Sequence, residues 1–204
     1  YYGSVDSTPL FVLLAGLYWK RSGDVATLRE LWPRIRAAIR WMDESGDLDG
    51  DGLVEYLRRS ANGLSNQGWK DSEDSVIHAD GTLARGSIAL CEVQGYVYAA
   101  KVLAAQVATA LGDGPLGNEL VAGAKNLRAR FEALFWMEEP GFYALALDGD
   151  KRACRVMASN AGHLLFCGMV SPGRARKVAG LRLSRNLFSG WGIRTLAESE
   201  LRYN

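Results

Sequence analysis

The stretch VQGYVYAAKVLAAQVATALGDGPLGNELVAGAKNLRARFEAL, residues 93–134, decides the fold class. Its first half places apolar side chains at steps of four and three, at Val93, Val97, Ala100, Ala104, Val107 and Leu111. Its second half repeats the spacing at Leu120, Ala124, Leu127, Phe131 and Leu134. Such spacing is typical of helices that bury one face. Gly112 to Gly114 interrupt the pattern and Pro115 suits a helix start, which predicts an antiparallel hairpin of helices at about 85–111 and 115–134.

Further helices are expected on both sides of this hairpin. Ser7 or Thr8 can cap a first helix that Gly23 ends, and Asp24 can cap a short helix through Leu31. Other expected helices cover about 33–44, 160–169 and 172–182, and the stripe Leu10, Leu14 and Leu17 is expected in the core. A small β-hairpin is predicted from 142–147 and 152–157 around the Asp-Gly-Asp-Lys turn. Together these expected elements predict an all-α single domain of helical hairpins with long loops.

Composition limits the function classes. The 204 residues are 48% hydrophobic and carry a formal net charge of +1, without a basic run. We therefore expect neither a nucleic-acid nor a membrane partner. Three widely spaced cysteines, Cys91, Cys154 and Cys167, predict buried reduced thiols and a cytoplasmic protein. Because the sequence starts with Tyr1 and has no terminating signal, we expect it to be a piece of something longer.

A polar connection from about 45 to 85 contains the strongest functional signal. Connections of this length are uncommon in compact helical domains unless they carry a function. The stretch 62–75, NGLSNQGWKDSEDS, joins amides, a tryptophan and three carboxylates. Together they can stack a sugar ring, bond its hydroxyls and move a proton, with Asp71 as general acid. The alternative is a solvated loop whose acids cap helices.

A second acidic segment resembles a calcium loop. Asp47, Asp49 and Asp51 precede Gly52 in the D-x-D-x-D-G order that wraps a hard cation, and Glu55 could add a ligand. Arg58 stands where the usual bidentate glutamate would be, so this is not a standard EF-hand. A structural Ca²⁺ is one expectation, and an Asp/Gly turn without metal is the other. No other cofactor is expected.

Five stretches resemble one known family in order along the chain. They are YGSVDSTPLF (2–11), NQGWKDS (66–72), EVQGY (92–96), SNAGHLL (159–165) and SGWGIRTL (189–196). They look like the bacterial amylo-alpha-1,6-glucosidase or glycogen-debranching-type family. This resemblance implies part of an (α/α)6 toroid with a carbohydrate substrate, an oligo- or polysaccharide. It also implies inverting hydrolysis of α-glucosidic bonds, with Asp71 as the acid and the general base outside these 204 residues.

Two other classes remain open. One is a non-catalytic, calcium-stabilised helical module that binds carbohydrate or a partner. The other is a different helical-toroid sugar enzyme, such as a mannosylglycerate-type hydrolase or an epimerase.

Several other residues are candidates for holding the substrate. Asp6 can bond sugar or cap the first helix, and Asp74 can bind sugar hydroxyls or cap a helix. For at least one of Glu92 and Gln94, an exposed position at a helix start is the expectation. His163 is either a satisfied core histidine or a residue near the sugar. The full predicted set is Asp6, Trp69, Lys70, Asp74, Glu92, Gln94, His163, Trp191 and Arg194.

Overall fold

The computed structural model describes residues 4–70 and 72–203. These residues form six α-helices, and all but one end close to where the sequence predicts an end. The helices are α1 (Ser7–Ser22), α2 (Val25–Arg40), α3 (Cys91–Ala110), α4 (Gly114–Leu134), α5 (His163–Cys167) and α6 (Pro172–Arg182). A π-helical turn, η1 (Trp41–Ser45), follows α2, and a 3₁₀ turn, η2 (Ser159–Gly162), precedes α5.

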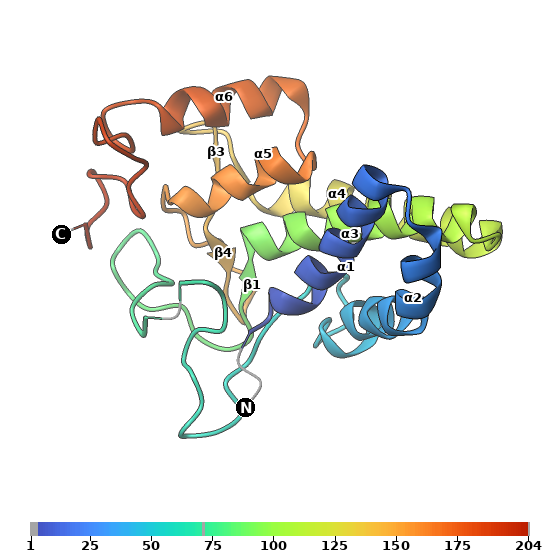
Figure 1. Ribbon diagram of the computed structural model, residues 1–204. Coiled ribbons are helices and arrows are strands. Elements are labelled where there is room, and N and C mark those ends of the chain that lie inside the picture. Colours follow the sequence, from blue (N-terminus) through green and yellow to red (C-terminus); the bar gives the residue numbers. More distant parts are fainter. Residues whose placement is uncertain (1–3, 71, 204) are drawn as a thin grey trace.

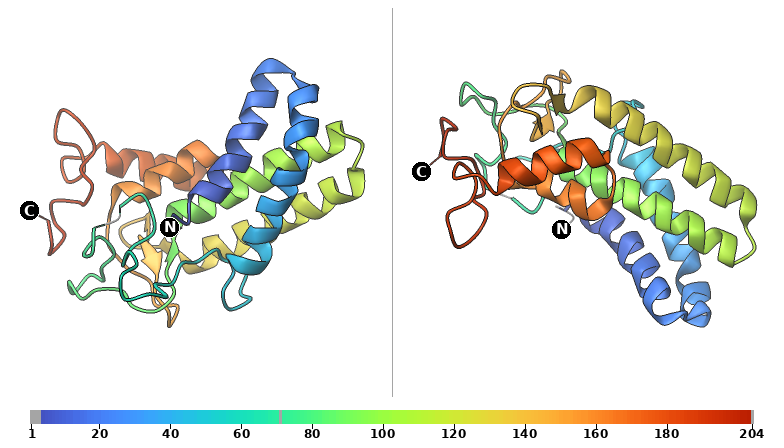
Figure 2. Two further views of the ribbon diagram at one scale, coloured as in Figure 1. Left: turned by 60° about the horizontal axis from the view of Figure 1, so that its bottom comes forward. Right: turned by 90° about the horizontal axis from the view of Figure 1, so that it is seen from above.

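The helices form part of a toroid with an inner and an outer row. Helix α3 packs between α1 and α5, while α2 packs on α1 and α4 packs on α3. Helices α1, α3 and α5 all run away from the end of the molecule where the long loops gather (Figure 1). Two further views show α1 to α4 extending together from that end (Figure 2). The predicted all-α partial toroid is therefore confirmed.

Glycines set the spacing of the inner helices. A Cβ at Gly16 of α1 would lie 2.6 Å from the Cβ of Leu103 on α3. A Cβ at Gly95 of α3 would lie 3.0 Å from a methyl group of Leu164 on α5. Since interiors are close-packed, these glycines allow the helix backbones to approach more closely than alanine would.

The expectation that Pro33 separates two helices is wrong. Asp24 caps the helix as predicted, accepting a hydrogen bond from the Thr27 amide at 3.0 Å, but α2 then continues through Pro33 to Arg40. Proline removes one intrahelical hydrogen bond, and here burial of Leu28 and Ile35 on either side of it holds the helix together. Propensity is only a weak guide where packing decides.

The expected core stripe of the first helix is wrong for Leu14 and Leu17, whereas Leu10 is partly buried and packs against the core. Leu14 is 66% exposed and Leu17 is 40% exposed. The buried face of α1 instead carries Val12 and Leu13, because that is the side that meets α2 and α3. Among the described residues, no element covers the face that carries Leu14.

The strands are short and pair differently from the predicted hairpin. Strand β1 (Ala89–Leu90) pairs with β4 (Ala146–Leu147), and β2 (Trp136–Met137) pairs with β3 (Phe142–Tyr143), both antiparallel. Across the turn at 148–151, the two arms of the predicted hairpin are joined by a bridge from Leu147 to Ala153 and by backbone hydrogen bonds, such as that from the Cys154 amide to the Ala146 carbonyl oxygen at 2.8 Å. The pairing of β1 with β4 therefore joins the start of α3 to that turn.

The three cysteines are free and buried, as predicted. In the described part of the chain, no helix combines the length and apolar character that crossing a bilayer requires.

Candidate functional site

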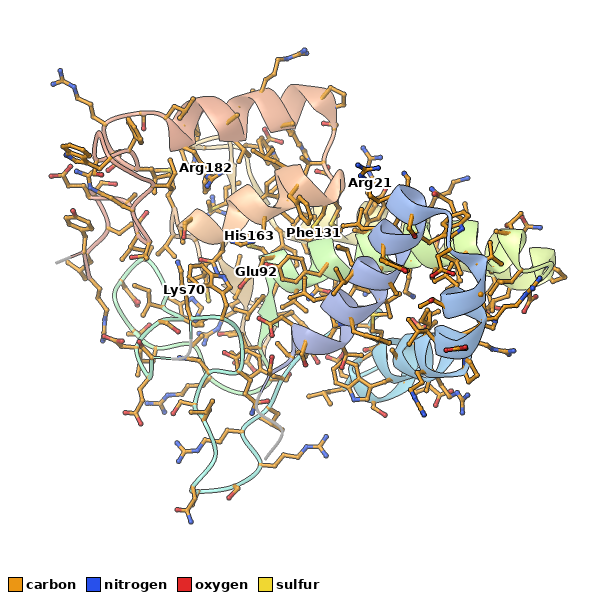
Figure 3. The ribbon with its side chains drawn as sticks, viewed as in Figure 1. Arg21, Lys70, Glu92, Phe131, His163 and Arg182 are labelled. Atoms are coloured by element: carbon orange, nitrogen blue, oxygen red, sulfur yellow. The ribbon has the colours of Figure 1, made fainter. Side chains whose placement is uncertain are left out.

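Several of the predicted site residues lie near one end of the inner helices. Figure 3 labels Glu92 at the start of α3, His163 at the start of α5, and Lys70 on the long loop beside them. Arg182, at the end of α6, faces the same region from the other side. Residues from four separate parts of the sequence therefore meet here.

Trp69 and Lys70 form one wall of a cavity of about 400 Å³. The Lys70 ammonium donates a hydrogen bond to the carbonyl oxygen of Thr195 at 2.7 Å and lies 5.1 Å from the centre of the Trp69 ring. Burial lowers the pKa of Lys70 to about 8. The cavity thus combines an aromatic face with a cation, groups that suit a sugar ring and an anionic substituent.

Asp71, the predicted general acid, lies outside the described residues. Lys70 and Ser72, on either side of it, both line the 400 Å³ cavity. Asp74 lines it too and is exposed. The described residues between 72 and 88 contain no helix, so the alternative in which Asp74 caps a helix is wrong.

Glu92 and Gln94 are both buried, which contradicts the expectation that at least one is exposed. Glu92 is 1% exposed and Gln94 is fully buried. Gln94 accepts a hydrogen bond from the amide of Val54 at 3.0 Å and donates one to its carbonyl oxygen at 2.7 Å. This side chain therefore fastens the 47–55 loop to α3.

Glu92 lies under the site in a polar cluster. The Asn160 amide donates a hydrogen bond to Glu92 Oε1 at 2.9 Å, while Asn160 Oδ1 has no partner in the described structure. Burial raises the pKa of Glu92 from 4.5 to about 6, although the Asn160 bond and the charge of Lys70 oppose this rise. Asn160 was not predicted as a site residue, and only its place in the SNAGHLL stretch pointed to it.

His163 connects the aromatic wall to α3. The Tyr96 hydroxyl and His163 Nδ1 are 2.8 Å apart, and the rings of Trp69 and His163 are 5.7 Å apart between centres. Burial, together with the charges of Arg182 and Lys70, lowers the pKa of His163. The imidazole is thus partnered as a core histidine would be and also touches the candidate sugar wall.

Asp6 is buried where α1 begins. Its side chain accepts a hydrogen bond from the Ser4 hydroxyl and makes no capping bond to α1. Asp6 thus occupies the N-cap position of α1, as one alternative expected, but without a capping bond from its side chain. The negative charge of Asp6 is near enough to Tyr96 to help raise the pKa of that phenol, behind burial and the charge of Glu92.

Trp191 and Arg194 both lie on the C-terminal loop, but their side chains have different surroundings. Trp191 is 99% exposed and does not line the 400 Å³ cavity. Arg194 donates hydrogen bonds to the Tyr203 hydroxyl at 3.0 Å and to the Arg185 carbonyl oxygen at 3.1 Å. Tyr203 lines the cavity, so Arg194 supports the cavity wall from behind.

The acidic loop holds its carboxylates close together. One oxygen from each of Asp47, Asp49 and Asp51 lies within 4.8 Å of the others. The ammonium of Lys151 lies among them, 2.9 Å from Asp49 and 2.8 Å from Asp51, and also pairs with Glu55. The carboxylates therefore fit a cation, but a side chain of the chain itself already occupies the position between them.

A second cavity, of about 670 Å³, opens on the other side of the long loop. It is lined in part by Ser7, Thr8, Tyr56 and Gln67. It does not include Trp69 or Lys70, and for this reason we assign the site to the smaller cavity.

The comparison with protein families settles the relationship. The model of the mannosylglycerate hydrolase MGH1-like glycoside hydrolase domain matches residues 4–204. The chain belongs to this family. Among curated proteins, no significant sequence match was found.

Solved structures confirm the fold of this MGH1-like domain. The GH63 mannosylglycerate hydrolase from Thermus thermophilus, in complex with glucose, matches with a TM-score of 0.73 and 16% identity over 96% of this chain and 56% of that chain. The GH78 rhamnosidase of Bacillus sp. GL1 matches with a TM-score of 0.66 and 18% identity over 87% of this chain and 17% of that chain. The chain thus spans little more than half of the mannosylglycerate hydrolase and a smaller share of the rhamnosidase.

The family match refines the resemblance found in the sequence. The expected membership of a glycoside hydrolase family and the expected helical toroid are confirmed. The match does not single out amylo-alpha-1,6-glucosidases within that class, and the substrate is treated below.

Proposed function

We propose that the protein hydrolyses an α-glycosidic bond with inversion of configuration, and that Asp71 is the general acid. The observation that carries this proposal is the cavity between the long loop and the C-terminal loop, whose wall includes the Trp69-Lys70 pair immediately before Asp71. Membership of a glycoside hydrolase family supports the same chemistry.

The proposed reaction needs two carboxyl groups with different protonation states. The acid must carry a proton for the leaving oxygen, and a carboxylate about 6.5–9.5 Å away must activate water. An aromatic neighbour such as Trp69 favours the protonated form of an acid by excluding water. Lys70 would oppose this, but its ammonium is bonded to Thr195 and lies over the Trp69 ring.

We place the water-activating carboxylate outside these 204 residues. Glu92 is buried beneath Asn160 and has no access to water on the sugar side. Its role in the proposal is to support the site from below.

Two substrate classes fit this chemistry. An α-glucan of the debranching type is one. A small glycoside of an organic acid, such as the mannosylglycerate named for the Thermus enzyme, is the other. The second is favoured by the positive charge at the site. Arg182 packs against Gly162, and its charge, like that of Lys70, lowers the pKa of His163. Arg182 Nε has no hydrogen-bond partner among the described residues.

The test uses the full-length protein and two sets of substrates, branched α-glucans and glycosides of glycerate. Asp71→Asn should lower kcat by about 10²–10⁴ while leaving sugar binding largely intact, since general acid catalysis contributes about that much. Glu73→Gln, at an exposed position of the same loop that does not line the cavity, is the matched control and should retain its turnover. NMR of the first product should show the inverted anomer.

Each outcome has a definite meaning. Unchanged turnover in Asp71→Asn would remove it as the acid. Sugar binding without turnover of any glycoside would favour the non-catalytic module, and an epimerised product would favour the epimerase. Arg182→Met should raise KM for the acidic glycosides and leave KM for neutral glucans unchanged if the acidic substrate is correct.

A further inference from the structure

We propose that Lys151 is the resident cation of the 47–55 loop, so that this calcium-like loop does not bind calcium in this protein. The proposal is independent of the glycosidase reaction. It concerns four carboxylates, those of Asp47, Asp49, Asp51 and Glu55, that the sequence suggests as metal ligands.

The number of donors on the Lys151 ammonium matches the number of carboxylates that surround it. A lysine ammonium has three N–H donors and no acceptor. Lys151 faces three carboxylates, with Nζ 2.9 Å from Asp49 Oδ2, 2.8 Å from Asp51 Oδ2 and also paired with Glu55. Each donor therefore has a charged acceptor, and the ammonium stands where alternate acidic side chains of a D-x-D-x-D-G loop would direct a metal ion.

The fourth carboxylate is used to shape the loop. Asp47 Oδ1 accepts hydrogen bonds from the amides of Gly50 at 2.9 Å and Asp51 at 3.0 Å, and its Oδ2 accepts one from Gly52 at 2.8 Å. Calcium usually takes six to eight oxygen ligands. With both Asp47 oxygens bonded to backbone amides and three carboxylates paired with Lys151, the loop has little capacity left for the ion.

The turn at 148–151 holds Lys151 in an unusual backbone conformation. Lys151 is the only non-glycine residue with positive φ in the described chain, at 59°. L-residues rarely adopt such a conformation, and surrounding contacts must hold it in place. Here the Lys151 amide bonds to the Asp148 carbonyl oxygen at 2.9 Å, and Asp148 Oδ1 accepts from the amides of Asp150 and Arg152.

A tight contact fixes where the turn lies. A Cβ at Gly149 would lie 2.9 Å from the Cα of Gly86, so the turn and the long loop touch backbone to backbone. The Gly149 amide also donates to the Arg85 carbonyl oxygen at 2.8 Å. The turn that carries Lys151 is therefore held in place beside the acidic loop, although it is distant from that loop in the sequence.

The loop has the features of a cation site once Lys151 is removed. Glu55 is buried, and its Oε2 has no partner among the described residues. Without the ammonium, Asp49, Asp51 and Glu55 would face one another uncompensated. A divalent ion would then relieve the repulsion, so the inference predicts a latent calcium site that a change at Lys151 exposes.

The experiment compares calcium binding by the full-length protein and by three variants, using calorimetry and thermal unfolding in EGTA or in 10 mM CaCl₂. The unaltered protein should give no binding heat, and its melting temperature should change by less than about 1 °C. Lys151→Met should lose stability in EGTA and regain about 5 °C or more with calcium. Lys125→Met, at an exposed position on α4, is the matched control and should behave like the unaltered protein.

Lys151→Glu keeps the test decisive if Lys151→Met does not fold in EGTA. It adds a carboxylate at the centre of the loop, so its folding should depend on calcium more strongly than that of any other form. Calcium binding by the unaltered protein below millimolar concentration would overturn the proposal. So would a failure of both Lys151 variants to respond to calcium, because the loop would then not be a cation cradle at all.

Discussion

Replacing Glu92 by Gln should make the protein more stable at neutral pH, although it removes a charge from beneath the candidate site. Glu92 is 1% exposed, and burial raises its pKa from 4.5 to about 6. An acid whose pKa is higher in the folded than in the unfolded protein carries no penalty while it is protonated in both. The penalty appears as pH rises from about 4.5 through about 6, because the folded protein then holds an ionised carboxyl in a poorly solvating place.

The size of the effect follows from the shift. One pKa unit corresponds to about 1.4 kcal/mol, so the rise of about 1.5 units makes ionisation of Glu92 cost about 2 kcal/mol of folding free energy. Gln keeps an oxygen to accept the Asn160 bond and adds an N–H₂ group that can reach the unpartnered Asn160 Oδ1. The difference in unfolding free energy between Glu92→Gln and the unaltered protein should therefore shift by about 2 kcal/mol in favour of Gln between pH 4 and pH 7.

Urea unfolding of both forms at half-unit pH steps measures this difference directly. Titrating groups that do not interact with Glu92 affect both forms alike and cancel in the subtraction, and Lys70, whose pKa is about 8, stays largely charged over this pH range. Glu119→Gln, at an exposed position on α4, provides the control and should show a difference that hardly changes with pH. A flat difference for Glu92→Gln as well would refute the reasoning, because it would mean that Glu92 titrates alike in the folded and unfolded chain.

Three further predictions follow from individual contacts. Gly16→Ala should destabilise the protein by about 1–3 kcal/mol because its Cβ would clash with α3, whereas Gly180→Ala, with open space around it, should stabilise by up to about 1 kcal/mol; thermal unfolding measures both. Gln94→Leu should cost about 1–3 kcal/mol and raise amide exchange at Val54, whose two bonds it removes. Acylation of Lys70 should rise with a midpoint near pH 8, in contrast to ordinary lysines, as peptide mapping would show.

The helical part of the fold could be predicted because it is encoded locally. The spacing of apolar residues in α3 and α4 and the glycine at the end of α1 each act within a few turns. The errors arose where packing between distant segments decides. Pro33 stays inside α2 because Leu28 and Ile35 on either side of it are buried, and Leu14 is exposed because α1 meets its neighbours on another face.

The site was harder to predict because its residue types have two uses. Gln94 was a reasonable sugar ligand by type, but its partner, Val54, lies 40 residues away and cannot be read from the local sequence. The acidic loop matched a calcium pattern, while the ammonium among its carboxylates comes from Lys151, 96 residues beyond Glu55. A motif specifies the geometry of its own residues, but not which distant side chain meets them.

The first turn of α3 connects these long-range contacts. Gln94 fastens the 47–55 loop on one side, and Glu92 bonds Asn160, at the entry to α5, on the other. Both side chains are buried, so loss of either partner leaves a polar group without water or a replacement bond, which costs more than the bond itself contributes. Under the proposed function, changes at this turn should therefore alter turnover by shifting the 47–55 loop and the start of α5, even though neither Glu92 nor Gln94 lines the cavity.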